Sequence, residues 1–315
     1  MAALPLLRWS RLGLGTAQFG LPYGVANRTG QVPYPLVLRI LERAAGRGIT
    51  LIDTAPAYGT SEASLGMALR ELGLGNAVMV CTKLDLAADY DSRSTGAVLE
   101  EVRSVLDSSR RALGLERLPV LQLHVPAHRW WRGGAIWDLL RAQRDAEAIG
   151  MIGVSMSGTD VDEARSVLAD PSVDVLQIPY NAFDQRWRSS GVLESAAARG
   201  VRVIGRSPYL QGLLAMSDGL VPPRLAHALP WKARFRRIAD DAGMEPAELA
   251  MRYALSAGEI ATTVAGVETL EQLETNLRYA DRGPLPAETA ARIEEELAGV
   301  PEAIAAPFLW PREPP

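Results

Sequence analysis

The chain has 315 residues, of which 48% are hydrophobic and 22% are charged, and its formal net charge is -4 at pH 7. This composition excludes a disordered or fibrous protein, and the slightly acidic balance excludes the basic surface that nucleic-acid-binding proteins carry. Cys81 is the single cysteine, which excludes an intramolecular disulfide and indicates a reducing compartment. No apolar run is long enough for a signal sequence or a membrane span. We therefore predict a cytoplasmic protein with no nucleic-acid or membrane partner.

Short apolar segments alternate along the chain with longer segments of helical periodicity. The short segments predict eight strands, at residues 11–18, 50–54, 78–83, 119–124, 151–155, 174–180, 201–207 and 260–266. After the first and third of them, apolar residues recur at the spacing of one helix face, between Val37 and Ala45 and between Val98 and Leu106. Further helices are predicted at residues 61–72, 135–150, 160–170, 191–200, 231–243, 246–258 and 269–280.

Strands that alternate with helices form parallel βαβ units, and eight units in roughly 250 to 300 residues are the size of a TIM barrel. A doubly wound sheet with a dinucleotide site would need a GxGxxG motif, but the third glycine of that motif falls on Gln18. We predict an α/β protein with a single-domain (β/α)8 TIM barrel over residues 10–285. A long connection around residues 218–230 follows the seventh strand, and residues 286–315 are predicted to form a C-terminal helix and tail on or near the barrel.

Three successive predicted strands end in polar residues. Asp53 ends the second strand, Lys83 the third and His124 the fourth, while Tyr58 follows in the loop after Asp53. Taken singly, each residue has an ordinary structural use, such as capping a helix, packing or facing solvent. Because the active site of a TIM barrel lies at the carboxyl ends of its strands, we expect the four side chains to converge there.

A buried lysine needs a carboxylate partner, and Asp53 on the neighbouring strand can provide one for Lys83. The ammonium would in turn stabilise the phenolate of Tyr58. A charge about 4 Å away in a partly buried site can lower a tyrosine pKa by roughly 2 units from about 10. We therefore interpret Asp53, Tyr58 and Lys83 as one device for general acid catalysis.

The sequence resembles the aldo-keto reductase superfamily across almost its whole length. The resemblance is carried, in the family's order, by GLGTAQFG from residue 13, LIDTAPAYG from 51, CTK from 81, LQLH from 121, GVS from 153, QIPYN from 177, SPYLQGLL from 207 and AGVETLEQLETN from 265. It implies a barrel that binds a nicotinamide cofactor without a Rossmann domain, and a catalytic tetrad of Asp53, Tyr58, Lys83 and His124. In that tetrad Tyr58 protonates the carbonyl oxygen of the substrate, and His124 orients the substrate or relays the proton.

The resemblance also implies the residues that bind the cofactor. They are Gly15, Thr16, Ser155, Gln177, Arg206, Ser207, Leu210, Gly212, Gly266, Val267, Glu268, Gln272 and Asn276. Family members usually carry an asparagine after the serine of GVS, where this chain has Met156, so one hydrogen bond to the nicotinamide carboxamide is in question. Many members stack an aromatic ring on the nicotinamide where this chain has Arg206, a cation that would repel the oxidised cofactor.

The segment expected beside the cofactor ribose is acidic. Members that prefer NADPH carry Lys or Arg here for the 2′-phosphate, whereas this chain has Glu268 and Gln272. A glutamate would repel a phosphate and accept a ribose hydroxyl, so we expect NAD(H) to be favoured over NADP(H). Thr269 and Gln272 also fit a helix capping box, which is a purely structural use.

Four aromatic residues lie in loops that would surround the substrate. Phe19 and Tyr23 follow the first strand, and Trp130 and Trp131 follow the fourth. They either pack loops onto the barrel or form an aromatic substrate pocket or a partner surface.

The sequence offers no good metal site. His124 and His128 are four residues apart, but Pro126 between them predicts a loop rather than a helix, and no third ligand is near. We therefore expect no metal, and we assign Cys81 to the core.

Two functions are open on the sequence. The first is an enzyme, an NAD(P)H-dependent reductase of aldehyde, ketone or sugar carbonyls with a small-molecule substrate. The second is an NADH-sensing regulator with little turnover that binds protein partners, like the KidO type of bacterial cell-division regulator, which is an aldo-keto reductase homologue that this chain also resembles.

Overall fold

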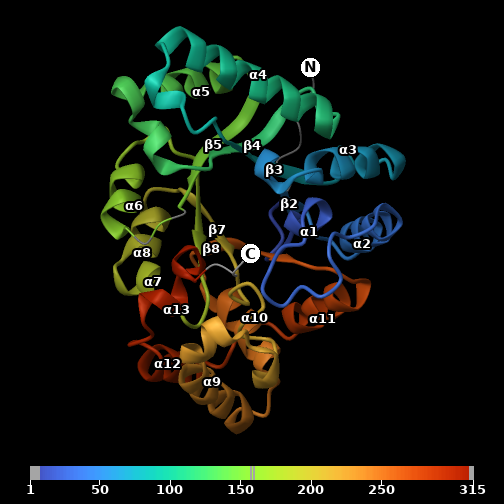
Figure 1. The fold of residues 1–315 in the computed structure, drawn as a ribbon, viewed down its shortest axis with the longest axis vertical. Helices are drawn as coiled ribbons and strands as arrows, with labels where there is room; N and C mark the ends of the chain where they lie inside the picture. Colours follow the sequence, from blue (N-terminus) through green and yellow to red (C-terminus); the bar gives the residue numbers. More distant parts are fainter. Residues whose placement is uncertain (1–7, 157, 159, 312–315) are drawn as a thin grey trace.

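The computed structural model describes residues 8–156, 158 and 160–311. Its strands form one closed barrel in which each strand pairs in parallel with the next and β8 pairs with β1 (Figure 1). The strands are β1 (Leu12–Gly15), β2 (Leu51–Asp53), β3 (Met79–Leu84), β4 (Leu118–Leu123), β5 (Ile149–Ser155), β6 (Val175–Pro179), β7 (Arg202–Arg206) and β8 (Ile260–Gly266). The predicted single-domain (β/α)8 barrel is confirmed.

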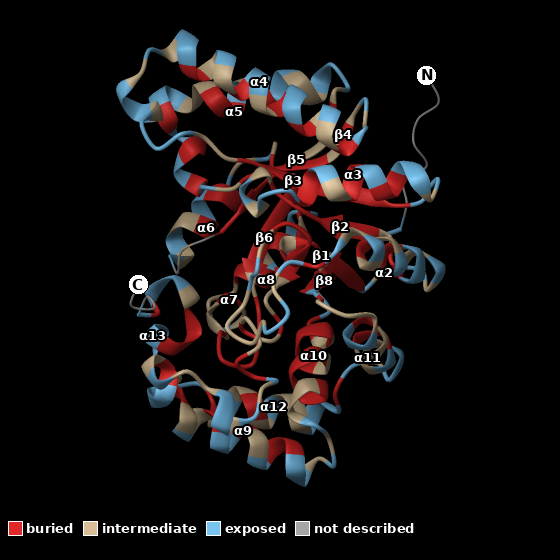
Figure 2. Cartoon of the chain, turned by 45° about the vertical axis from the view of Figure 1, so that its right-hand side comes forward, coloured by how far each residue is buried: buried red, intermediate tan, exposed pale blue. Residues whose placement is uncertain are grey.

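Helices follow every strand and surround the barrel. In chain order they are α1 (Ala17–Gly20), α2 (Tyr34–Gly46), α3 (Ser61–Glu71), α4 (Thr95–Leu113), α5 (Ala135–Asp145), α6 (Val161–Leu168), α7 (Arg186–Ser189), α8 (Val192–Ala198), α9 (Leu229–Asp241), α10 (Pro246–Ser256), α11 (Leu270–Asp281), α12 (Ala287–Glu296) and α13 (Glu302–Ala305). Figure 2 shows them with exposed outer faces around a buried sheet. This division follows the amphipathic spacing in the sequence, as in α2, where Val37, Ile40 and Leu41 are buried.

The inside of the barrel is filled by a separate apolar cluster. Its members include Leu51, Cys81, Val120, Val175 and Ile204, which come from β2, β3, β4, β6 and β7. Successive side chains of a strand alternate between the two faces of the sheet, so residues two positions further on also point into the barrel. The next inward-facing layer therefore lies at the carboxyl ends of these strands.

Two predicted element boundaries are wrong. The first strand was predicted to continue to residue 18, but it ends at Gly15 because Ala17–Gly20 turns into the short helix α1. The helix predicted to reach residue 150 ends at Asp145, and β5 already begins at Ile149. Glu147 adopts a left-handed backbone conformation with φ of 60°, which breaks the helix before the strand.

The connection after β7 and the C-terminal segment pack together beside the barrel. The long connection contains two 3-10 turns and leads into α9, against which α12 packs (Figure 1). Gln185, in the loop after β6, donates to the carbonyl of Ile293 at 3.0 Å and links α12 to the barrel. The C-terminal helix α12 thus packs beside the barrel, while residues 312–315 of the tail fall outside the described residues. In the described part of the chain, no helix has the length and apolar character to cross a membrane.

Gly66 shows how closely the outer helices pack. A Cβ atom at this position of α3 would lie 2.0 Å from the carbonyl oxygen of Ala112 on α4. We expect Gly66→Ala to lower the free energy of unfolding by about 1–3 kcal/mol through overpacking, measured by urea denaturation. Gly96→Ala, in α4, is the matched control, because nothing lies within 4 Å of its added Cβ and alanine favours a helix. An equal loss of unfolding free energy in the two variants would contradict the close contact between α3 and α4 at Gly66.

Candidate active site

A buried ion pair joins β2 to β3 at their carboxyl ends. Asp53 and Lys83 each lie two residues beyond a member of the apolar cluster inside the barrel, Leu51 and Cys81. The Nζ atom of Lys83 lies 2.7 Å from Oδ1 of Asp53 and also donates to the carbonyl of Thr54 at 2.9 Å. The side chain of Lys83 is 1% exposed and that of Asp53 is 6% exposed. Burial has the largest single effect and lowers the pKa of Lys83, but Asp53, with smaller contributions from Tyr58 and Cys81, more than offsets it. The net shift of the pKa is upward, and the lysine is charged at neutral pH.

The carboxylate of Asp53 has a second partner from across the barrel. Gln177 on β6 donates from Nε2 to Oδ1 of Asp53 at 2.8 Å, and its Oε1 accepts a 3.0 Å hydrogen bond from the hydroxyl of Ser155 on β5. Ser155 and Gln177 are direct neighbours in the β5–β6 pairing. A continuous polar network therefore runs from Ser155 to Lys83, which fixes the orientation of the carboxylate.

Tyr58 lies beside this pair in a short 3-10 turn, Pro56–Tyr58. Its ring centroid is 5.2 Å from Nζ of Lys83 and 6.2 Å from the ring of His124, which meets it edge to face. The backbone of the turn is held tightly, because a Cβ atom on Gly20 would lie 1.7 Å from the carbonyl oxygen of Tyr58. The four residues predicted to converge at the strand ends do lie together.

Lys83 lowers the pKa of Tyr58, as the sequence predicts, but it does not set the net direction of the shift. Burial raises the pKa of Tyr58 above its ordinary value near 10, Lys83 opposes this shift, and Asp53 adds to it, so the net direction is upward. The ammonium is paired with Asp53, which offsets much of its charge. The phenol therefore keeps its proton at neutral pH.

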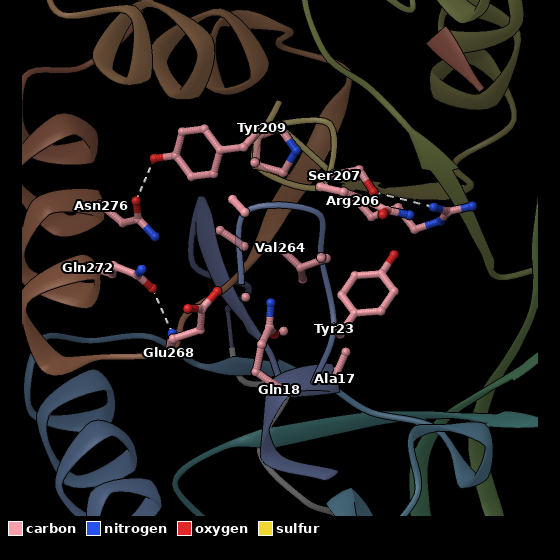
Figure 3. A pocket seen from close by; sticks show the side chains of 18 of the residues that line it. Ala17, Gln18, Tyr23, Arg206, Ser207, Tyr209, Val264, Glu268, Gln272 and Asn276 are labelled. Atoms are coloured by element: carbon pink, nitrogen blue, oxygen red, sulfur yellow. Dashed lines mark hydrogen bonds between the residues drawn. The ribbon is translucent and has the colours of Figure 1, made fainter. Parts of the chain in front are cut away.

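A cavity of about 720 Å³ opens above the ion pair. It extends from Tyr58 and His124 to helix α11, and Figure 3 shows Arg206, Ser207 and Tyr23 on one side of it and Glu268, Gln272 and Asn276 on the other. Most of the residues predicted to bind a cofactor line it: Gly15, Thr16, Ser155, Arg206, Ser207, Gly212, Gly266, Glu268, Gln272 and Asn276. Gln177, Leu210 and Val267 are fully buried and do not line the cavity.

The α11 side of the cavity is built on a helix N-terminus. Thr269 accepts from the backbone N–H of Gln272 at 3.2 Å, and Oε1 of Gln272 accepts from the backbone N–H of Glu268 at 2.7 Å. The N-cap bond of the capping box expected from the sequence is thus present, but the reciprocal bond of Gln272 goes to Glu268, one residue before the N-cap Thr269. Within the described residues, the carboxylate of Glu268 accepts one hydrogen bond, from Thr29 at 3.3 Å, and it lines the cavity.

The two departures from the family pattern lie next to each other. Arg206 donates from Nη2 to the carbonyl of Met156 at 3.0 Å and from Nη1 to the hydroxyl of Ser207 at 3.4 Å. The side chain of Met156 is fully buried in the core. Arg206 therefore uses part of its guanidinium to tie β7 to the end of β5, while it still lines the cavity.

Three of the four aromatic residues expected around the substrate lie elsewhere. Tyr23 lines the cavity, but Phe19 is fully buried in the core. Trp131 is also buried and donates from its indole nitrogen to Asp91 at 2.8 Å, while Trp130 is half exposed and stacks on the guanidinium of Arg129 at 3.8 Å. Phe19, Trp130 and Trp131 therefore do not line this cavity, and each has another packing partner.

The cavity also contains residues that were not predicted. Gln18 lies on its floor, with its amide packed so closely on the end of β8 that a Cβ on Gly266 would lie 2.3 Å from it (Figure 3). Tyr209 closes the cavity near α11 and donates to Asn276. Gln18 lies within the GLGTAQFG motif and Tyr209 within the SPYLQGLL motif, each two residues after a predicted cofactor residue, and this position was the available signal. Among the described residues, no group of three or more His, Cys, Asp or Glu could hold a metal.

The loop after β7 lines much of this cavity and is held by a buried lysine. Ser207, Leu210 and Gln211 all have positive φ, so the loop backbone is in a costly conformation that needs support. Lys232 on α9 is 4% exposed and donates from Nζ to the carbonyls of Leu213 and Met216 in this loop. Burial lowers its pKa to about 8.

The sequence profile of the Aldo/keto reductase family matches residues 11–298. The chain belongs to this family. This aldo/keto reductase is 30% identical over 292 residues to an uncharacterized oxidoreductase of Mycobacterium tuberculosis, with 86% of this chain and 84% of that protein covered. It is 24% identical over 290 residues to the L-glyceraldehyde 3-phosphate reductase of Escherichia coli O157:H7, with 82% and 83% covered.

Solved structures of aldo-keto reductases have the same fold. The holo form of an enzyme from Bacillus halodurans superimposes with a TM-score of 0.74 at 20% identity, covering 93% of both chains. A protein of Pseudomonas aeruginosa described as a putative aldo-keto reductase gives a TM-score of 0.64 at 23% identity, covering 87% of this chain and 90% of that chain. Family membership and its reductase relatives make the chain an oxidoreductase.

Lys232 predicts a pH dependence of stability. Its pKa is about 8 in the folded protein but about 10.4 in an unfolded chain, so the unfolded state binds more protons between these values. The stabilising effect of Lys232 therefore grows as the pH rises. We expect the free energy of unfolding of the wild type, relative to Lys232→Met, to increase by roughly 2 kcal/mol between pH 8 and 10. If urea denaturation showed that the difference in unfolding free energy between the wild type and Lys232→Met stays constant or falls over this pH range, the lowered pKa of Lys232 would be contradicted.

Proposed function

We propose that the protein is an NAD(H)-dependent reductase of small aldehyde, ketone or sugar carbonyls, with Tyr58 as the general acid. The observation that carries this proposal is the convergence of a protonated tyrosine, a charged lysine and a histidine at the inner end of a large cavity. Aldo/keto reductases bind nicotinamide cofactors, and a nicotinamide cofactor supplies the hydride when it is bound. The protein must then supply a proton to the carbonyl oxygen and hold the substrate in place.

Each residue of the tetrad has a distinct part in this proposal. Tyr58 holds the proton that is transferred from its phenolic oxygen to the carbonyl oxygen of the substrate. Charged Lys83, 5.2 Å from the ring centroid, stabilises the phenolate left behind, and Asp53 holds Lys83 in place. His124 faces the same end of the cavity and can donate to or accept from the carbonyl oxygen.

The residues of the cavity fit a dinucleotide. A space of about 720 Å³ lies within the usual range for cofactor sites, and its walls combine apolar surface with a few directed polar groups. Ser155, Asn276 and Gln272 would hold the cofactor by hydrogen bonds, because each places an amide or hydroxyl at the cavity surface.

The charge of the cavity supports NAD(H) over NADP(H). Glu268 and Glu271 line its α11 side, and Arg206 at the other side is the only arginine or lysine among the described residues that line it. A 2′-phosphate would thus meet carboxylates without a compensating cation, whereas a ribose hydroxyl could donate to Glu268.

Tyr58→Phe removes the proton donor and tests this proposal. We expect turnover of carbonyl substrates with NADH to fall by about 100-fold or more, while NADH binding, followed by fluorescence, stays within roughly threefold. Tyr34→Phe is the matched control, because the hydroxyl of Tyr34 bonds Glu71 outside the cavity. Equal turnover in Tyr58→Phe and the wild type would overturn the proposal. NADH binding without turnover by the wild type on a panel of aldehydes, ketones and sugars would favour the regulatory alternative.

The cofactor preference has its own test. We expect the wild type to bind NADH at least about tenfold more tightly than NADPH, and Glu268→Gln to narrow this ratio by weakening the repulsion of the 2′-phosphate. Glu288→Gln on α12, an exposed carboxylate outside the cavity, should leave the ratio unchanged. Tighter binding of NADPH by the wild type would show that Glu268 does not set the preference.

A further inference from the structure

A carboxylate outside the tetrad faces His124. Oδ2 of Asp85 lies 3.5 Å from Nδ1 of His124, with the two side chains 37% and 25% exposed. The barrel register produces this contact. Leu84 of β3 pairs with Leu123 of β4, and the backbone N–H of His124 donates to the carbonyl of Leu84 at 3.0 Å. Asp85 and His124 are thus the next residues along two paired strands, and their side chains point to the same face of the sheet.

This face is the one that carries the tetrad. Asp85 lies two residues beyond Lys83, so the alternation along β3 turns both side chains toward the carboxyl-end opening of the barrel. His124 lines the cavity and its ring meets that of Tyr58 edge to face, whereas Asp85 does not line the cavity. Asp85 therefore contacts the histidine from behind, on the side away from the cavity.

The charges around this pair are few. Besides His124, His128 also lowers the pKa of Asp85. Nδ1 of His128 is buried and has no hydrogen-bond partner among the described residues. Glu101 in turn raises the pKa of His128 and accepts a hydrogen bond from the backbone N–H of Ala87. On the cavity side, His124 faces the phenol of Tyr58, and behind that ring the charge of Lys83 is paired with Asp53. Among the described residues, Asp85 is the carboxylate that lies within 4 Å of a His124 ring nitrogen. Contact with His124 holds the pKa of Asp85 below its ordinary value.

We propose that Asp85 is a positioning residue for His124. The carboxylate of Asp85 accepts a hydrogen bond from Nδ1–H of His124, and this leaves Nε2 directed at the carbonyl of the substrate. The assignment of a substrate rests on the proposed function, but the contact between Asp85 and His124 does not. The hydrogen bond made by one ring nitrogen decides which tautomer the other presents. Without Asp85, the neutral ring would favour a proton on Nε2 and would turn more freely in the cavity.

A purely structural use of Asp85 is a poor explanation of the contact. The pair is partly exposed to solvent, and ion pairs of this kind add little to the stability of a fold. The effect of Asp85 is instead expected in the state of the histidine ring, which can be observed directly.

The test is the tautomer of His124, read from the ¹⁵N chemical shifts of its ring at a pH where it is neutral. The chain has only three histidines, so His124→Gln assigns the signals and His227 serves as an internal reference. We expect the Nδ1–H tautomer in the wild type and in Asp85→Asn, which keeps an acceptor oxygen, and the Nε2–H tautomer in Asp85→Ala. An Nε2–H tautomer in the wild type, or an unchanged tautomer in Asp85→Ala, would overturn the proposal.

Kinetics give the second readout. For a carbonyl substrate with NADH, Asp85→Ala should lower kcat/KM roughly tenfold, with partial recovery in Asp85→Asn and NADH affinity within about twofold. Asp89→Asn removes a carboxylate that pairs with Arg93 on the same loop and should leave kcat/KM unchanged. If Asp85→Ala turned over as fast as the wild type, the positioning role would be wrong. If the wild type turned over no carbonyl at all, the proposed function would fail, while the tautomer measurement would still decide the role of Asp85.

Discussion

The buried ion pair between Asp53 and Lys83 is the constraint on which the site depends. A lysine ammonium with 1% of its side chain exposed is stable only if its charge is paired and its protons are accepted, and Asp53 and the carbonyl of Thr54 meet both needs. Removing either partner alone would leave an unpaired buried charge, which costs about 3–5 kcal/mol. The ends of β2 and β3 are therefore locked together, and the turn that carries Tyr58 begins just beyond this point.

The polar groups at the inner end of the cavity are connected to that ion pair. Gln177 and Ser155 extend its hydrogen bonds across the barrel to the cavity surface, and His124, supported by Asp85, closes the inner end opposite Tyr58. The wall made by the loop after β7 is strained, and it is supported by the other lysine of the chain, Lys232. Both lysines are buried and both hold backbone or side-chain groups of this site, whereas the exposed positive charges are all arginines.

The fold and the convergence of Asp53, Tyr58, Lys83 and His124 were predictable from sequence because both follow from short-range patterns. Apolar runs alternating with amphipathic helices specify a parallel barrel, and polar residues that end adjacent strands must meet at one rim. The acidity of Tyr58 was not predictable in sign, since it depends on how deeply the ring is buried. The places of Phe19, Trp130 and Trp131 depend on loop conformations, which no periodicity encodes. Asp85 was missed because one more residue of strand pairing, visible only in the register, brings it to His124.

A double-mutant cycle on Asp53 and Lys83 tests the central claim most directly. The free energy of unfolding is measured for Asp53→Asn, Lys83→Met and the double variant by urea denaturation at pH 7. If the pair is the constraint described here, each single variant loses about 3–5 kcal/mol, and the double variant loses much less than the sum, because no unpaired charge remains buried. Losses that simply add would show that the two residues act independently, and that the ion pair does not organise the site.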